Sequence, residues 1–338
     1  MKIAILRNTP DARVFFRRGR QNREFYKESD IEAARDALAD AGHEVRIFEA
    51  DATLPDALVR AYARPDRTMP DDLFAFNLAY GVQGECRYTH VPALLELLGV
   101  PYLCSGPRGH TLALDKYLTK VLLDRAGLPT PAFRLLTSPA DDLAGLEYPA
   151  VVKAQFESTS FGLRIVDDER ELEEAARAIR DEFDQPALVE TFVPGREVNC
   201  GLIGNAPPTA LPVLEIDFGD VPDRDRIATL EAKRRRTVRH ICPAELAPDL
   251  AAAVQELAVR TFVELGCRDC ARVDFRIDAD GRPWILEINS MAAIHPFGSY
   301  FDAAKTLGWT YPEMLQRLLD VATERYRKAE RKRSRPEA

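Results

Sequence analysis

Arg272-Val-Asp-Phe275 and Leu286-Glu-Ile-Asn289 are the two stretches of sequence that decide the fold. Both combine apolar and polar residues as short strands do, and an Asp-Gly pair between them is typical of a hairpin turn. Glu287 and Asn289 are two residues apart and therefore project from one face of their strand, where Asp274 can lie opposite them. Oxygen donors without Cys or His suit Mg²⁺ that is held partly by substrate phosphates. On this pattern alone, a hairpin with a solvated polar face is an equal alternative.

Composition bounds the class of protein. The 338 residues are 46% hydrophobic and 30% charged, as expected for two or three globular lobes. No apolar run approaches the ~20 residues of a membrane span, and Met1–Leu6 is too short for a signal peptide. A net charge of −8 argues against a general nucleic-acid binder. We therefore expect a cytoplasmic protein with no nucleic-acid or membrane partner, whose scattered cysteines are reduced thiols.

Strand and helix patterns alternate through the first hundred residues. Apolar periodicity predicts strands at 3–6, 44–48 and 73–77, and helices at 28–41 and 91–98. Repeated strand–helix units indicate a parallel sheet covered by helices. No G-x-G-x-x-G or Walker P-loop occurs in this part, so neither of these nucleotide-binding motifs is predicted there.

The next part of the chain carries two lysines suited to phosphate binding. A helix predicted over 112–126 includes Lys116, and Gly127-Leu-Pro-Thr-Pro131 then breaks the chain. Lys153 ends a predicted strand directly before a Ser/Thr loop closed by Gly162. Such a loop offers backbone and hydroxyl donors to phosphate oxygens, and the lysines add charge. The set therefore suits phosphoryl transfer, although a lysine at a strand end is also a common surface residue.

The order of these motifs resembles the ATP-grasp superfamily, and within it the D-alanine–D-alanine ligases. The resemblance runs from about Asn77 to about Leu319. The motifs that carry it are Gly84-Glu85, 99–106, 113–116 with Lys120, 127–131, 151–153, 157–162, 189–197, Lys233, 272–275 and 287–289. The resemblance implies an α/β fold of the ATP-grasp type, with a parallel N-terminal lobe, a small central lobe and a C-terminal lobe with an antiparallel sheet. The expected boundaries are 1–107, 108–190 and 191–325, followed by a basic tail at 326–338.

The resemblance also implies a role for each matching residue. The ATP-binding residues would be Lys116, Lys153, Glu157, Ser158, Thr159, Ser160, Glu190, Val193 and Glu197, of which the last three hold adenine and ribose. Two Mg²⁺ ions, or Mn²⁺ in their place, would be held by Asp274, Glu287 and Asn289. Lys233 would face the γ-phosphate from a second lid loop. Arg272 would stabilise the oxyanion that forms when an amine attacks an acyl phosphate.

Three segments depart from the D-alanine ligase pattern, and all three concern the substrates. The usual glutamate after the first strand has no match in Arg7–Asp11, and the usual His-Gly pair is replaced by Tyr80-Gly81. After Asn289 the chain continues as 290–300, where Ser299 is the expected substitute for the serine that faces the second substrate. The remaining substrate-site candidates are Glu85 and His295, and a lone histidine near a turn is as well explained by a structural role. We therefore predict intact ATP machinery with remodelled substrate pockets.

Four functions follow from this reading and stay open at the level of sequence. The first is an ATP-dependent ligase that joins a small-molecule carboxylate and an amine, acting on an amino acid or a dipeptide-like substrate. A genuine D-alanine–D-alanine ligase is the second. The third is a cyclising or acyl-phosphate-forming enzyme, and the fourth is a nucleotide-binding protein without catalysis. Family resemblance also suggests a homodimer.

Overall fold

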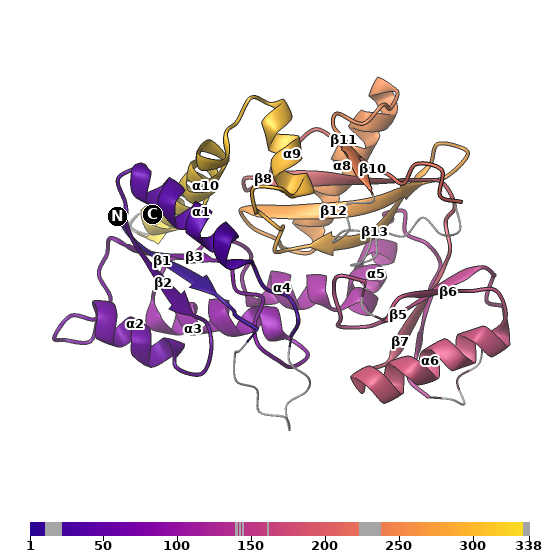
Figure 1. The fold of residues 1–338 in the computed structure, drawn as a ribbon, viewed down its shortest axis with the longest axis horizontal. Coiled ribbons are helices and arrows are strands. Elements are labelled where there is room, and N and C mark those ends of the chain that lie inside the picture. Colours follow the sequence, from indigo (N-terminus) through magenta and orange to yellow (C-terminus); the bar gives the residue numbers. More distant parts are fainter. Residues whose placement is uncertain are drawn as a thin grey trace.

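Three separate sheets, each with its own helices, organise the chain (Figure 1). The structure, a computed structural model, describes residues 1–10, 22–138, 141, 143, 145–160, 162–222 and 238–333. The N-terminal sheet is parallel, in the order β2-β1-β3. The elements of this lobe are β1 (Lys2–Arg7), α1 (Glu28–Asp40), β2 (Glu44–Glu49), α2 (Leu54–Tyr62), β3 (Leu73–Asn77), the 3₁₀ helix η2 (Arg87–Thr89) and α3 (His90–Leu98).

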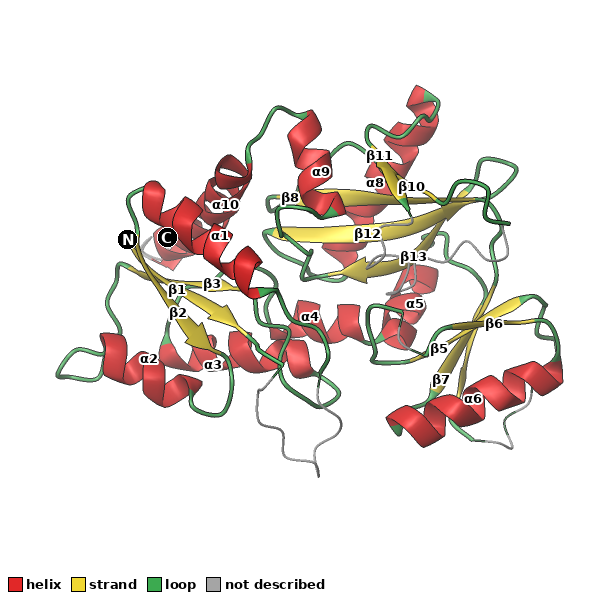
Figure 2. Cartoon of the chain, viewed as in Figure 1, coloured by secondary structure: helices red, strands yellow, loops and turns green. Residues whose placement is uncertain are grey.

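Helices cover both faces of the N-terminal sheet, which explains why its central strand is apolar from Ile3 to Leu6 (Figure 2). Ile3 and Ile5 of β1 belong to a buried cluster that includes residues of α1 and of the C-terminal helix. Ala4 and Leu6, which point to the opposite face, belong to a cluster built with α2 and α3. All four side chains are completely buried, so the strand could not alternate apolar with polar residues.

The central lobe is a small antiparallel sheet with one helix across it. Its strand order is β4-β7-β5-β6. Helix α6 buries Leu172, Ala175, Ala176 and Ile179 against the sheet, at the spacing of one helical face. The elements of this lobe are β4 (Phe133–Leu136), β5 (Ala150–Ala154), β6 (Arg164–Val166), α6 (Glu169–Phe183) and β7 (Ala187–Thr191).

The C-terminal sheet is antiparallel and contains the predicted hairpin. Its order is β11-β10-β8-β12-β13, with β9 paired to β8. Helix α8 packs on one face of this sheet. The elements are β8 (Arg196–Ile203), β9 (Thr209–Ala210), β10 (Leu214–Asp217), β11 (Arg239–Ile241), α8 (Pro248–Glu264), β12 (Cys270–Ile277), β13 (Pro283–Asn289), α9 (Ser299–Thr306) and α10 (Tyr311–Arg333).

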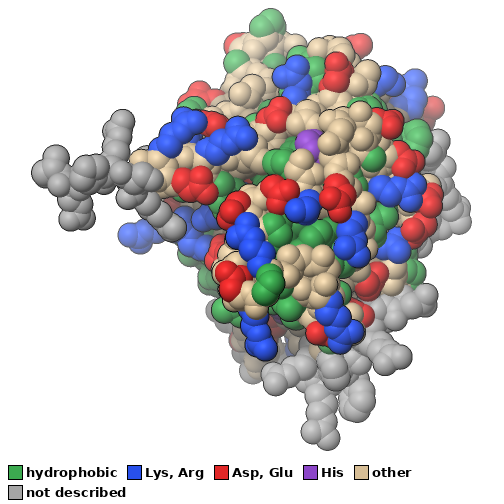
Figure 3. All heavy atoms as spheres, turned by 90° about the vertical axis from the view of Figure 1, so that its left-hand side faces the viewer, with side chains coloured by type: hydrophobic (Ala, Val, Ile, Leu, Met, Phe, Trp, Pro, Cys, Tyr) green, Lys and Arg blue, Asp and Glu red, His purple; other side chains and the backbone are tan. Residues whose placement is uncertain are grey.

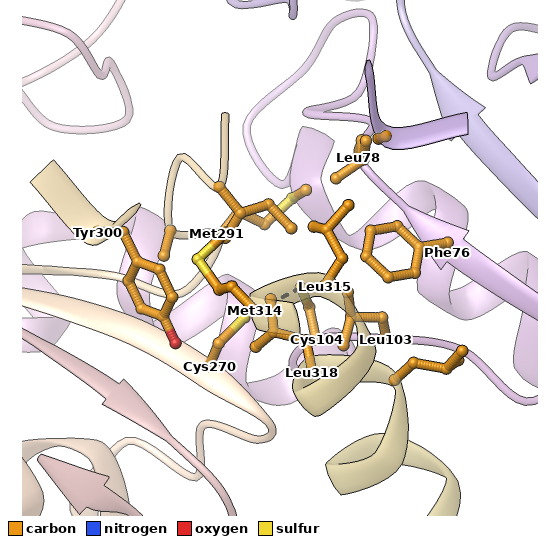
Figure 4. Packing of buried hydrophobic residues seen from close by; sticks show 14 of the residues in the cluster. Phe76, Leu78, Leu103, Cys104, Cys270, Met291, Tyr300, Met314, Leu315 and Leu318 are labelled. Carbon is orange, nitrogen blue, oxygen red and sulfur yellow. Dashed lines mark hydrogen bonds between the residues drawn. The ribbon is translucent and has the colours of Figure 1, made fainter. Parts of the chain in front are cut away.

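This arrangement confirms the predicted fold class: a parallel N-terminal lobe and two lobes built on antiparallel sheets. The lobe boundaries stay predictions, because helices cross between the lobes. Helix α10 packs against α1, and its Met314 and Leu315 lie in one buried cluster with Phe76 of β3 and Tyr300 of α9 (Figure 4). The first and last parts of the chain are therefore held together by one core.

The single helix predicted over 112–126 is wrong. The structure has two helices, α4 (Pro107–Leu114) and α5 (Lys116–Arg125), which are separated at Asp115. Asp115 has an extended backbone (φ −78°, ψ 97°), and its side chain accepts a hydrogen bond from Leu118 N at 3.0 Å. It therefore caps α5, a local effect that apolar periodicity does not reveal. As a result, Lys116 is the first residue of a helix.

The C-terminal helix is longer than predicted. The sequence predicted a basic tail from residue 326, but helix α10 continues to Arg333. Residues 326–333 contain no Gly or Pro, and their Lys, Arg, Ala and Glu residues favour a helix. Arg325 also fixes the helix by binding Asp269 through two hydrogen bonds of 2.8 and 2.9 Å.

The surface is mixed in charge. The face of the molecule on the left of Figure 1, turned toward the viewer in Figure 3, shows Lys and Arg side chains interspersed with Asp and Glu. Within the part of the chain that the structure describes, no helix is long and apolar enough to cross a membrane.

Candidate functional site

The β12–β13 hairpin brings the three predicted metal ligands together. Asp274 pairs with Glu287 across the two strands, and Arg272 pairs with Asn289. Asn289 Nδ2 lies 3.0 Å from an Asp274 oxygen and 3.5 Å from a Glu287 oxygen. The two carboxylates, with the Asn289 amide beside them, offer hard oxygen ligands and leave positions open for substrate oxygens, which fits Mg²⁺. Histidine and cysteine contribute nothing to this group, which argues against a zinc site.

Arg272 lies beside this group and is held by it. Its Nε and Nη2 donate to the two oxygens of Asp274 at 2.6 and 2.7 Å, and its Nη1 lies 3.4 Å from Ser299 Oγ. Burial lowers the pKa of Arg272, but the charge and hydrogen bonds of Asp274 raise it above its ordinary value. The guanidinium therefore stays charged between the metal ligands and Ser299.

A buried group of lysines faces the hairpin from the other side of a cleft. Lys153, at the end of β5, lies 2.7 Å from Glu190 Oε1, and Lys120 of α5 lies 3.3 Å from Glu190 Oε2. Lys120 is completely buried and also donates to Thr130 Oγ1 at 2.7 Å and to Ile285 O at 3.1 Å. Burial lowers the pKa of Lys120 to about 8. Burial also raises the pKa of Glu190, but the two lysines outweigh it and lower that pKa below its ordinary value.

The loop at residues 157–160 closes one side of the cleft. Lys116 Nζ donates to the carbonyl of Glu157, and Gln185 donates to the Glu157 side chain at 2.8 Å. Thr159 and Ser160 have positive φ angles of 53° and 61°, a left-handed conformation that costs free energy for residues other than glycine. Contacts from other elements therefore hold this loop in shape.

All nine residues predicted to bind ATP line this one cleft, which contains about 880 Å³ of empty space including its open mouth. Asp274 and Glu287 line it as well, and so do the apolar side chains of Val151, Leu163, Phe192 and Leu286. These apolar side chains form an apolar slot that suits the base of a nucleoside triphosphate. The lysines and carboxylates suit its phosphates.

The structure separates the substrate-site candidates. Glu85 is exposed on a turn and does not line the cleft. His295 is half-buried and packs edge-on against Tyr26, whose ring stacks on Tyr80 at 5.5 Å. Ser299 begins α9 next to Arg272, and its role toward a substrate stays a prediction. Lys233 lies outside the described residues.

Sequence reasoning missed three buried cations. Lys120 was counted among the family motifs but given no role, although it follows Lys116 by four residues and therefore shares its helix face. Arg276 lines the cleft and binds Glu197 at 3.3 Å, and its two-residue spacing from Asp274 was the available signal. Arg87 reaches the 157–160 loop from the N-terminal lobe, which no sequence pattern indicated.

Comparisons with known proteins agree with this geometry. The family model "D-ala D-ala ligase C-terminus" matches residues 122–320. An uncharacterized protein, y4sG, from Sinorhizobium fredii is 40% identical over 86% of both chains. A D-alanine–D-alanine ligase from Moorella thermoacetica is 32% identical over 96% of this chain and 100% of its own length.

The chain belongs to the D-alanine–D-alanine ligase family of ATP-grasp ligases. Solved structures of this family share its fold. The ligase from Bacillus anthracis complexed with ATP aligns with a TM-score of 0.74 and 22% identity over 98% of this chain and 99% of its own. The ligase from Coxiella burnetii aligns with a TM-score of 0.74 over 98% and 96% of the two chains. The family match at 122–320 includes the hairpin, whereas Lys116 and the N-terminal lobe lie before it.

Proposed function

We propose that the protein is an ATP- and Mg²⁺-dependent ligase that joins a carboxylate to an amine through an acyl phosphate. The observation that carries this proposal is the single cleft in which Lys116, Lys153 and the 157–160 loop face Asp274 and Glu287. The lysines would contact phosphate oxygens, and the apolar slot would receive adenine. Of the residues expected to contact ATP, all but Lys233 are among the described residues and line this cleft.

The reaction would proceed in two transfers. A substrate carboxylate oxygen attacks the γ-phosphorus of ATP, the bond to the β–γ bridging oxygen breaks, and ADP leaves. An amine then attacks the acyl carbon, and phosphate departs from the tetrahedral intermediate as the amide forms. In this route the group that the amine displaces is phosphate, which leaves readily, and not oxide, which leaves poorly.

The residues have separate tasks in these transfers. Asp274, Glu287 and Asn289 would hold Mg²⁺, which neutralises charge on the transferring phosphoryl group. Lys116 and Lys153 are positioned to orient the phosphates. Arg272 would stabilise the oxyanion of the tetrahedral intermediate with donors that Asp274 already holds in place.

We further propose that the substrates are an amino acid or dipeptide-like carboxylate and an amine other than the D-alanine pair. The support is a cluster of aromatic side chains near Arg272. In this cluster, Tyr26 stacks on Tyr80 and packs against His295. Tyr26 Oη also accepts a hydrogen bond from Ile294 N at 3.1 Å, so it fixes the segment that follows the metal ligands. Tyr80 and His295 stand in segments where the sequence leaves the D-alanine ligase pattern, and Tyr26 contacts both.

A genuine D-alanine–D-alanine ligase is the second candidate, because named ligases reach 34% identity over 74% of this chain. A panel of carboxylates and amines, scored by Mg²⁺-dependent release of ADP and by product mass, separates the two. Robust turnover with D-alanine alone to give its dipeptide would refute the substrate shift. A cyclic product or a released acyl phosphate would indicate the cyclising or acyl-phosphate-forming alternative, and no ADP with any pair would refute the ligase.

A further inference from the structure

Arg87 connects the N-terminal lobe to the 157–160 loop. It is the first residue of η2 and is only 3% exposed. Its Nη1 donates to Phe156 O at 2.8 Å, and its Nη2 donates to Ser158 Oγ at 3.2 Å. Nη2 also lies 3.7 Å from Glu157 Oε2. One guanidinium therefore contacts three consecutive residues that lead into the loop.

The other side of Arg87 is anchored within its own lobe. Glu24 Oε2 lies 3.6 Å from Nη2, and the same oxygen accepts a hydrogen bond from Tyr88 Oη at 2.5 Å. The Tyr88 ring lies 5.4 Å from the guanidinium carbon, within the range of a cation–π contact. Gly81, with a positive φ of 79°, lies so close that an added Cβ would be 2.1 Å from the Arg87 carbonyl oxygen. The backbone of Arg87 therefore packs directly against Gly81.

The loop needs such an anchor because its own backbone is strained. Thr159 and Ser160 adopt the left-handed region, and each such residue costs on the order of 1 kcal/mol. Lys116 of α5 and Gln185, which follows α6, also hold Glu157. Arg87 supplies the contact from the N-terminal lobe.

We propose that Arg87 is a positioning residue that latches the 157–160 loop in its cleft-lining conformation from the N-terminal lobe. The part of this proposal that concerns ATP rests on the proposed function. The latch itself is a property of the free protein. Arg87 and Glu24 both belong to the N-terminal lobe, so a shift of the segment that carries Glu24 would move the guanidinium that holds the loop.

Hydrogen exchange of the loop, combined with nucleotide binding, tests the latch. Arg87→Met removes the donors, and Arg87→Met with Glu24→Gln removes the buried charge that the first variant leaves unpaired. Arg87→Lys keeps the charge but cannot donate to two acceptors as the planar guanidinium does. Arg46→Met is the matched control, since Arg46 is an N-terminal-lobe arginine that lies over the Phe48 and Tyr62 rings, at 5.6 and 5.4 Å.

We expect exchange in a peptide covering 155–163 to become roughly 10-fold faster or more in both Arg87→Met variants, and KM for ATP to rise roughly 10- to 100-fold with a smaller change in kcat. Arg87→Lys should be intermediate, and Arg46→Met should match the wild type. Unchanged loop exchange in a folded Arg87→Met protein, or in the double variant if the single one does not fold, would overturn the latch. Faster exchange spread evenly over the chain would also overturn it, because it indicates general destabilisation. If the wild type binds no ATP, the proposed function fails, while exchange in the free protein still decides the latch.

Discussion

Glu190 is predicted to determine whether Lys120 stabilises or destabilises the protein. Its carboxylate lies 2.7 Å from Lys153 and 3.3 Å from Lys120, and the side chains of Lys120 and Glu190 are 0% and 3% exposed. Glu190→Gln leaves two buried ammonium groups without their nearest carboxylate. Removal of one member of such a buried pair costs about 3–5 kcal/mol. Lys120→Met alone should cost less, about 1–3 kcal/mol, because Lys153 still neutralises Glu190.

The double variant separates this electrostatic account from ordinary packing. In the Glu190→Gln background, Lys120→Met removes an unpaired buried charge and should restore stability, so the same substitution changes sign between the two backgrounds. The coupling free energy should be about 2–3 kcal/mol. Urea unfolding at pH 7, followed by fluorescence and circular dichroism together, measures all four proteins. Lys328→Met, which removes an exposed pair with Glu324, is the control and should shift stability by less than about 0.5 kcal/mol. Additive effects of the two buried substitutions would refute the reasoning.

Three further predictions follow from the site. Arg272→Ala should abolish amide formation while ATP still binds, as calorimetry with a non-hydrolysable analogue would show; normal turnover would exclude the oxyanion role. Glu287→Gln should raise the Mg²⁺ concentration needed for half-maximal ADP release by roughly 10-fold or more without loss of folding, and an unchanged Mg²⁺ dependence would remove Glu287 from the metal site. The folded-state pKa of Lys120 is lowered to about 8, so the unfolded chain binds more protons between pH 8 and 10.5, and stability should rise with pH in that window. Between pH 7.5 and pH 10, the urea midpoint should rise less in Lys120→Met than in the wild type. Equal rises of the midpoint would contradict the lowered pKa of Lys120.

The hairpin could be predicted from sequence because its signals are local. Alternation of side chains, an Asp-Gly turn and a two-residue spacing place Asp274 opposite Glu287, as the strand register has them. The order of motifs then predicted three lobes and the residues of one cleft. Each of these inferences depends on neighbours along the chain or on a family pattern. Neither of these two sources requires knowledge of how the lobes pack.

Features that depend on packing between lobes could not be predicted in this way. The break at Asp115 depends on a side-chain cap and on Gln155, which donates to Asp115 at 2.9 Å from the central lobe. Arg87 and Glu24 are 63 positions apart in the numbering and meet only because η2 packs beside the segment that leads into α1. Lys120 resembles any helical lysine until the fold buries it against Glu190. Its role follows from burial, which a single sequence does not show.

Transfer of oxygen from the substrate carboxylate to phosphate tests the central proposal most directly. The carboxylate–amine pair that supports Mg²⁺-dependent ADP release would be prepared with ¹⁸O in both carboxylate oxygens. An acyl phosphate places one of these oxygens between carbon and phosphorus, so the released phosphate should carry one ¹⁸O atom for each amide formed, as mass spectrometry would detect. Phosphate without the label, at full amide yield, would contradict the proposed mechanism.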